Sequence, residues 1–305
     1  MTNREALKRL EEISLQLHEV DYNYIMELLK NSVRKIPIPL AKLHQYATVD
    51  RARKNIGNDL FTSADQLTYI KDQNVIDNYL TEFGRANKPH EPMFYGAIKS
   101  SVLDKPRATA IAETSKLFQD PEGHNLEGEL YTISRWENKS EIIVVEVVFA
   151  AEAIKINPDI KKAFEKQTEF AKEAGADDLE FYTDFLIFIS EQFARKTKSH
   201  NDYKIAAAYT ELVLQHPDVR GVMFPSVQTG YMGVNIVFPP NVVDHNLELL
   251  FATTHKLYKS QQKTLISNHM KCLNAQQNPE NLEWQNTEQQ YLTKEEYIKE
   301  YFKIQ

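Results

Sequence analysis

The spacing of apolar residues near the N-terminus is that of an amphipathic helix. Its apolar positions recur at intervals of three and four residues: Leu10, Ile13, Leu17, Val20 and Tyr24. This spacing predicts a single helix with one apolar face. Such a face either pairs with a partner helix or packs on the protein's own core, and we favour core packing because short stripes of this kind are common in globular helices. We therefore expect residues 1–45 to form a helical extension.

The middle of the chain carries shorter apolar runs separated by turn residues, a pattern typical of strands. We expect strands at residues 46–52, 93–97, 130–135, 142–149, 221–224 and 233–238. Polar residues 137–140 separate the third run from the fourth and predict a hairpin that pairs them. From about residue 158 to residue 217 the spacing is helical again, which predicts a helical insertion. The central domain, residues 46–245, is therefore expected to be α+β.

The C-terminal part contains no glycine, since all nine glycines lie between Gly57 and Gly233. Because glycine marks turns and unusual backbone conformations, we expect residues 246–305 to form a helical extension. Its main element is predicted to be a long helix from His245 to about Leu273. A second, short helix is expected to dock on the core through four apolar side chains: Tyr297, Ile298, Tyr301 and Phe302.

The composition is that of a globular protein and argues against several functions. The 305 residues carry a net charge of −7 at pH 7, whereas nucleic acids and anionic membranes recruit basic faces. The longest apolar run, residues 142–154, contains two glutamates and is shorter than the roughly 20 residues that span a membrane. The single cysteine, Cys272, rules out an intrachain disulfide and fits a reducing compartment. We expect a cytoplasmic protein that binds neither nucleic acid nor membrane.

Two arginine-bearing segments of the central domain are candidates for binding an anion. Arg85 lies in a loop between Gly84 and Pro89, and a guanidinium on a constrained loop suits bidentate recognition of phosphate or carboxylate. Taken alone, an ordinary surface arginine is the simpler interpretation. Arg51 and Arg53 lie two residues apart on a predicted strand, so their side chains point the same way and can add to one anion site.

An acid and an aromatic residue extend this set. Glu113 lies on a helix predicted from Asp104 to Phe118, with apolar residues on both faces, so its carboxylate should face inward. A buried carboxylate is costly unless it is paired, and it belongs either to a salt bridge that fixes the helix or to a binding site. Tyr95 lies on the strand that follows the Arg85 loop, where it either stacks on an aromatic ligand ring or serves as a core residue.

Ser226 ends a predicted strand and precedes Gly230 and Gly233. Its surroundings lack the Gly-x-Ser-x-Gly pattern of a nucleophile elbow, and the glycines form neither a dinucleotide-binding fingerprint nor a P-loop. A serine in this position is better suited to hydrogen-bonding a phosphate than to covalent attack. His269 and Cys272 lie three residues apart, but two ligands do not make a metal site, so no metal is expected.

Taken together, these residues resemble the RES family, named for its arginine, glutamate and serine. The matching segments occur in the family's order: Asp50-Arg51-Ala52-Arg53, Gly84-Arg85-Ala86-Asn87 with Phe94-Tyr95-Gly96, Ala112-Glu113-Thr114, and Phe224-Pro225-Ser226-Val227-Gln228 with Asn235. They span residues 46–245, roughly two-thirds of the chain. Each motif alone is weak, and four in order are specific. The chain is longer than the compact toxins of the family by its helical insertion and its two flanks.

The resemblance implies a fold like that of ADP-ribosyltransferases, in which small mixed or antiparallel sheets with helices hold NAD in a cleft. NAD would be a substrate rather than a cofactor. The enzyme would cleave the bond between nicotinamide and ribose as an NAD phosphorylase or glycohydrolase, with phosphate or water as the acceptor. The alternatives are a protein ADP-ribosyltransferase and a non-catalytic nucleotide-binding or interaction module.

The resemblance also bears on partners and on individual residues. Many members of the family are toxins neutralised by an Xre-type helix-turn-helix antitoxin; the helical additions of this chain would cover the cleft, replace that interface or join copies in a homo-oligomer. The catalytic residues would be Glu113, which stabilises the positive charge that develops as nicotinamide leaves, and Arg85, which holds a phosphate. Further positions implied to bind the substrate are Arg51, Arg53, Tyr95, Ser226 and Asn235. Which of the first two is the family's arginine stays open.

Overall fold

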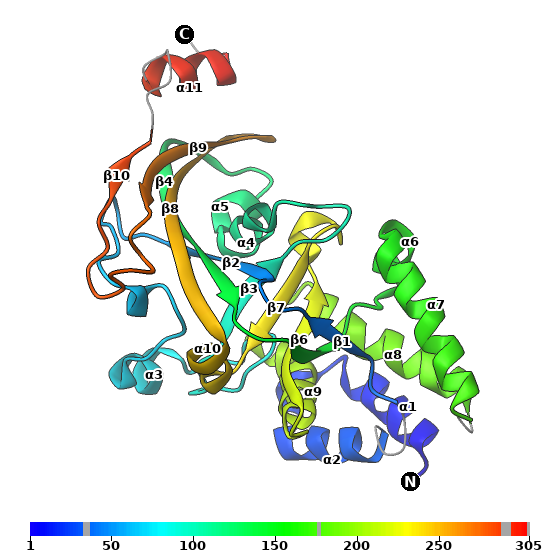
Figure 1. The fold of residues 1–305 in the computed structure, drawn as a ribbon. Helices are drawn as coiled ribbons and strands as arrows, with labels where there is room; N and C mark the ends of the chain where they lie inside the picture. The colour runs from blue at the N-terminus through cyan, green and yellow to red at the C-terminus, as the bar shows by residue number, and fades with distance from the viewer. Residues whose placement is uncertain (33–36, 176–177, 288–293, 304–305) are drawn as a thin grey trace.

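The computed structural model describes residues 1–32, 37–175, 178–287 and 294–303, and the strands within these ranges form one mixed sheet (Figure 1). The strands are β1 (Leu40–Leu43), β2 (Thr48–Lys54), β3 (Phe94–Ile98), β4 (His124–Asn138), β5 (Ile142–Glu146), β6 (Val219–Pro225), β7 (Val234–Phe238), β8 (Leu247–Ser260), β9 (Lys263–Cys272) and β10 (Gln285–Asn286).

Some neighbouring strands of the sheet come from distant parts of the chain. The order across the sheet is β1-β5-β6-β7-β3-β2-β4-β8-β9-β10. Strands β5 and β6 are parallel, and the other neighbouring pairs are antiparallel. The middle of the sheet therefore joins β6 and β7, from the second half of the chain, to β3 and β2, from the first half.

Along the chain, helices lie before, between and after these strands. They are α1 (Asn3–Ile13), α2 (Tyr22–Ser32), α3 (Gln73–Tyr79), α4 (Pro106–Thr114), α5 (Lys116–Gln119), α6 (Ala151–Ile156), α7 (Pro158–Glu173), α8 (Leu179–Ala194), α9 (Lys204–Leu214), α10 (Pro240–Asn246) and α11 (Lys294–Phe302). Short 3-10 turns are η1 (Leu17–Glu19), η2 (Ala64–Gln66), η3 (His200–Tyr203) and η4 (Val227–Thr229).

Two hydrophobic cores cover opposite faces of the central strands, because successive side chains of a strand alternate between the faces. On one face, Phe224 and Val237 pack against α1, α2, α8 and α9, which Figure 1 shows gathered beside β6. On the other face, Ile236 and Phe238 pack with Trp136 and with side chains of α10. Helix α4 lies against β2, β3 and β7. The first face therefore carries α4 over one part of the sheet and α8 and α9 over another.

The α+β architecture is confirmed, but two predictions about the strands are wrong. In the described part of the chain, the strands join edge to edge in one ten-stranded sheet instead of several small ones. Residues 137–140 do not form a hairpin either, since β4 pairs with β2 and β8 while β5 pairs with β1 and β6. The side chain of Asn138 explains the different path: its Nδ2 donates to the carbonyls of Leu43 and His44, both at 3.1 Å. These bonds tie the end of β4 to the end of β1 instead of folding the chain back on itself.

The predicted helix from His245 to Leu273 is wrong, so residues 246–305 are not a helical extension. Residues 247–272 form the long antiparallel pair β8 and β9 instead. The turn between these strands contains Gln261 with φ of 54°, a left-handed conformation that glycine adopts more readily. The prediction missed this turn because it took the absence of glycine to mean the absence of turns, and here a glutamine adopts the left-handed conformation.

The short C-terminal helix is confirmed as α11. Its Phe302 is buried in a small cluster with Tyr258 of β8 and Leu265 of β9. The helix therefore docks on β8 and β9, at the top of the view in Figure 1.

The N-terminal segment is helical, but the predicted single helix is wrong. It consists of α1, η1 and α2, because Asp21 begins a new helix: its Oδ1 accepts from the backbone N–H groups of Asn23 at 2.9 Å and Tyr24 at 3.3 Å. Residues 40–43, also expected to be helical, join the sheet as β1. Core packing of the apolar stripe is confirmed for its buried members: Leu10, Ile13 and Leu17.

The predicted helices at about residues 158–217 are present as α7, α8, η3 and α9, and we refer to this segment as the helical insertion. Helices α8 and α9 pack on β6 and belong to the core of the first face. No helix within the described ranges combines the length and the apolar character needed to cross a membrane.

Candidate active site

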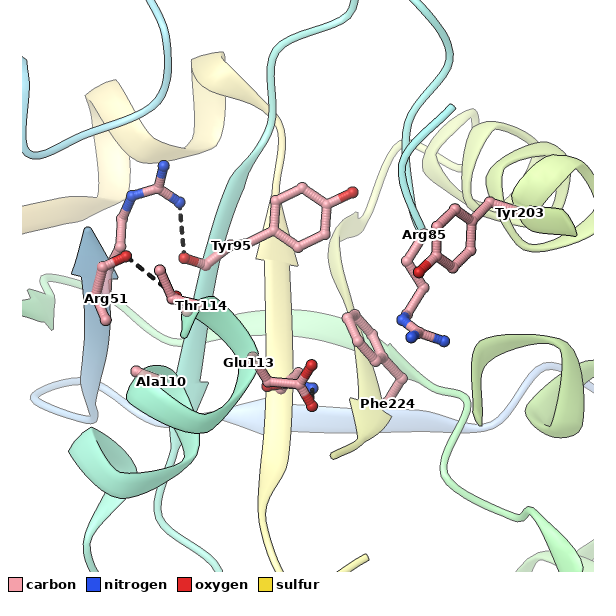
Figure 2. A pocket seen from close by; sticks show the side chains of 11 residues that line it. Arg51, Arg85, Tyr95, Ala110, Glu113, Thr114, Tyr203 and Phe224 are labelled. Carbon is pink, nitrogen blue, oxygen red and sulfur yellow. Dashed lines mark hydrogen bonds between the residues drawn. The ribbon is translucent and has the colours of Figure 1, made fainter. Parts of the chain in front are cut away.

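A cavity of about 330 Å³ lies on the first face of the sheet, between α4 and η3. It is lined by Arg51, Ala52, Arg85, Tyr95, Gly96, Ala110, Glu113, Thr114, Tyr203, Phe224 and Asn235. Figure 2 shows Arg51 on one side of this cavity and Arg85 with Tyr203 on the other, with Glu113 and Tyr95 between them. Residues predicted from four separate motifs therefore meet at one place, while Arg53 and Ser226 are absent from the lining.

Glu113 supplies the carboxylate of the cavity from the last turn of α4. Its Oε1 accepts hydrogen bonds from Ser226 Oγ at 2.6 Å and from Asn235 Nδ2 at 3.1 Å. Both donors are buried and neutral, and a carboxylate held by two fixed donors has little freedom to turn. Oε2 accepts no hydrogen bond from the described residues, which leaves it available to the cavity. Glu113 makes no salt bridge within these residues. The carboxylate therefore does not form the structural ion pair that was the alternative to a binding site.

Ser226 lies behind Glu113, at the start of the turn between β6 and β7. Its side chain is fully buried, and its Oγ also accepts from the N–H of Thr229 at 3.3 Å. The backbone of Gly233 closes the same turn by accepting from the N–H of Ser226 at 2.9 Å. A Cβ on Gly233 would collide with Thr109 of α4, so glycine is what lets this turn approach the helix. The serine therefore contacts the acid of the site, and the cavity wall is formed by other residues.

Arg51 projects from β2 and contacts only neutral groups within the described residues. Its Nη1 donates to the carbonyl of Tyr95 at 2.8 Å, and its guanidinium lies 5.0 Å from the centre of the Phe94 ring. Its Nε is buried and has no hydrogen-bond partner there. Burial, reinforced by the nearby charge of Arg53, lowers the pKa of Arg51 to about 9, so the group stays protonated at neutral pH. A cation without a carboxylate partner is suited to receive an anionic ligand.

Arg53 is directed elsewhere, although it lies on the same strand. Its Nη1 donates to the carbonyl of Gln66, and its guanidinium lies 5.4 Å from the ring centre of Phe61. Of the two candidate arginines, Arg51 is the one that lines the cavity.

Arg85 reaches the cavity from the loop after α3. Its Nη1 donates to the carbonyl of Phe193 and, at 3.3 Å, to that of Arg195. Its guanidinium also lies 5.0 Å from the ring centre of Tyr203. No carboxylate pairs with Arg85 within the described part of the chain, so the cavity holds two guanidinium groups that are unneutralised by ion pairs.

Tyr95 connects the strand β3 to the loop that carries Arg85. Its hydroxyl donates to Asn87 Oδ1 at 2.6 Å and accepts from the N–H of Ala86 at 3.0 Å. Burial raises the pKa of Tyr95, which keeps the hydroxyl protonated and able to donate. Its ring lines the cavity, so Tyr95 both forms a wall and fixes the arginine loop.

Sequence reasoning missed Tyr203, which lines the cavity from η3. The residue lies in the helical insertion and belongs to none of the four motifs. The local signal was the Ser199-to-Asp202 capping box that sets the turn just before it. That signal fixes a turn, but only the packing of α8 and α9 on β6 brings the turn to the cavity.

Comparisons with known proteins do not identify this arrangement. No family model matches the chain, and no curated protein matches it. Among the described residues, no group of three or more His, Cys, Asp or Glu side chains is placed to hold a metal ion. The function is therefore argued from the cavity.

Proposed function

We propose that the protein is an NAD-degrading enzyme of RES type that cleaves the bond between nicotinamide and ribose. The observation that carries the proposal is the placement of Glu113: one oxygen of its carboxylate is fixed by Ser226 and Asn235, and the residue lines a cavity with a guanidinium on either side.

The charges of the cavity are complementary to those of NAD. The dinucleotide carries two negative phosphates and one positive pyridinium ring. Arg51 and Arg85 supply cations without carboxylate partners among the described residues, and Glu113 supplies an anion between them. A volume of about 330 Å³ lies within the range of small-molecule sites. We therefore propose that the phosphates of NAD bind the guanidinium groups of Arg51 and Arg85. The cationic nicotinamide riboside would lie against the carboxylate of Glu113.

The carboxylate would act where charge develops during the reaction. As the C–N bond breaks, its electron pair leaves with neutral nicotinamide and the ribose takes on oxocarbenium character. A preorganised negative group stabilises this charge without further rearrangement. Water then gives ADP-ribose and a proton, whereas phosphate gives the 1″-phosphate of ADP-ribose. Both acceptors fit the proposal.

The cellular setting follows from the same resemblance. We propose a cytoplasmic enzyme that belongs to a toxin–antitoxin pair with an Xre-type helix-turn-helix partner. The buried free thiol of Cys272 fits a reducing compartment. Co-purification of a small helix-turn-helix protein that lowers the rate of nicotinamide release supports this setting. An unchanged rate in its presence contradicts it.

One assay separates the candidate activities. The purified chain is incubated with NAD labelled in its ADP-ribose part, with and without phosphate and with candidate acceptor proteins, and the products are separated by chromatography. Free nicotinamide together with ADP-ribose or its 1″-phosphate supports degradation. Label retained on protein indicates a transferase instead. Saturable NAD binding without turnover indicates a nucleotide-binding module, and the absence of both binding and turnover refutes the proposal.

A further inference from the structure

Residues of the helical segment 158–217 hold Arg85 at the wall of the cavity through two different kinds of contact. The first is made by the end of α8. The last carbonyls of a helix lack partners within the helix and carry the negative end of its dipole. Arg85 Nη1 donates to two carbonyls at this end, those of Phe193 and Arg195. The guanidinium therefore caps a helix of 16 residues.

The second contact is made by Tyr203 of η3. The face of its ring lies against the guanidinium, with 5.0 Å between Arg85 Cζ and the ring centre. Such a cation–π contact is stronger where water is excluded, and both side chains are half-buried at the cavity wall. The ring therefore occupies part of the space next to the guanidinium, and a ligand must approach Arg85 from another direction.

The position of Tyr203 is itself fixed by its neighbours. Ser199 and Asp202 form a capping box that sets the turn on the N-terminal side. On the C-terminal side, Lys204 Nζ donates to the carbonyls of Leu17 at 3.0 Å and Val20 at 2.8 Å. These contacts fix the backbone on both sides of Tyr203 and thereby set where its side chain starts.

These contacts leave a defined part of Arg85 free. Within the described residues, its hydrogen bonds all leave from Nη1, so Nε and Nη2 remain to donate. That edge of a guanidinium matches two oxygens of a phosphate or carboxylate. We infer that Tyr203 is a positioning residue, which holds Arg85 so that its Nε–Nη2 edge receives an anionic phosphate group of the substrate. This inference rests on the proposed function.

The test is a double-mutant cycle measured by binding, because binding does not require turnover. The probe is ADP-ribose, titrated by calorimetry into the full chain. Tyr203→Leu removes the aromatic face but keeps an apolar side chain, whereas Tyr203→Phe keeps the face. We expect Tyr203→Leu to weaken ADP-ribose binding about 5- to 30-fold and Tyr203→Phe to bind within about twofold of the unmodified chain.

The background of Arg85→Ala gives the decisive comparison. If Tyr203 acts through Arg85, Tyr203→Leu has no further effect on binding in that background, since coupled residues are not additive. Equal weakening in both backgrounds means that the ring contacts the ligand directly, and it overturns the inference, as does wild-type binding by Tyr203→Leu. Absence of ADP-ribose binding by the unmodified chain also overturns it. Binding without nicotinamide release leaves the inference in place and refutes the proposed catalytic function, so the two failures are distinguishable.

Discussion

Replacing Ser226 by alanine tests whether this serine acts on the substrate or on Glu113. The change removes the 2.6 Å hydrogen bond to Glu113 Oε1 and leaves the 3.1 Å bond from Asn235. Because Ser226 is fully buried and does not line the cavity, the contacts available to NAD stay the same. The proposed function therefore predicts a lower kcat with a nearly unchanged KM for NAD.

The size of the effect follows from the kind of bond that is lost. A hydrogen bond to a charged group contributes about 1.5–3 kcal/mol. If most of this acts on the orientation of the carboxylate in the transition state, kcat falls about 10- to 100-fold, since each ~1.4 kcal/mol corresponds to a factor of ten. Two other roles for Ser226 predict different kinetics. If the serine binds phosphate, its replacement would raise KM. If it is a nucleophile, its replacement would lower the rate about 10⁶-fold.

The assay is the initial rate of nicotinamide release at several NAD concentrations, with Ser100→Ala as the matched control. Ser100 is also a buried serine, whose Oγ donates to the carbonyl of Met232 at 2.6 Å and accepts from the N–H of Leu103 at 3.0 Å. It does not contact Glu113, so its replacement should cost comparable stability, ~1–3 kcal/mol, with little change in kcat. A rise in KM with unchanged kcat in Ser226→Ala, or an equal loss of kcat in both variants, refutes the reasoning.

Three further predictions address charge and pH. Glu113→Gln should lower kcat at least 10²-fold, roughly the effect of removing one transition-state contact, while Glu122→Gln, at an exposed acid, should keep full activity; similar rates in both would exclude Glu113 as the acid. Arg51→Gln should raise the KM for NAD about 10- to 100-fold and Arg53→Gln less than about threefold, as measured by initial rates; the reverse order would contradict the placement of Arg51 in the cavity. Burial, with a smaller contribution from the charge of Arg107, lowers the pKa of His255 from 6.5 to about 4, so the unfolded state binds the proton more readily. Stability is then full above about pH 6.5 and falls by up to ~3 kcal/mol as the pH drops to about 4; thermal melts of His255→Gln over this range should show a smaller drop, and an identical drop would refute the assignment.

Most residues of the candidate site were predictable because they carry a local signal. Arg85 follows Gly84 in a constrained loop, and Glu113 occupies a helix with apolar residues on both faces. Such signals depend on residues close in the chain. The contact of Ser226 with Glu113 joins residues 113 positions apart, so the sequence indicated both groups without indicating that one orients the other.

The parts of the fold that were missed depend on long-range packing or on an unusual turn residue. The β8–β9 pair turns at Gln261 in a left-handed conformation, for which the sequence offers no glycine. Tyr203 reaches the cavity only because α8 and α9 pack on β6. Asn138 redirects the chain through bonds to carbonyls near the end of β1. None of these contacts leaves a periodic pattern in the residues around it.

One donor to Glu113, Ser226, begins the turn of the β6–β7 hairpin, and the other, Asn235, lies on its second strand, so the site depends on the register of this hairpin. Asn235 of β7 pairs with Phe224 of β6, and Ser226 follows two residues after Phe224. A slip of one residue in β7 would turn the side chain of Asn235 to the opposite face of the sheet, and it would also shift the turn that places Ser226 against α4. Molecules with this error would lose both hydrogen bonds to Glu113 together. The hairpin therefore provides both hydrogen bonds to Glu113 or neither of them. Glu113 is correctly oriented only when β6, β7 and α4 have folded together.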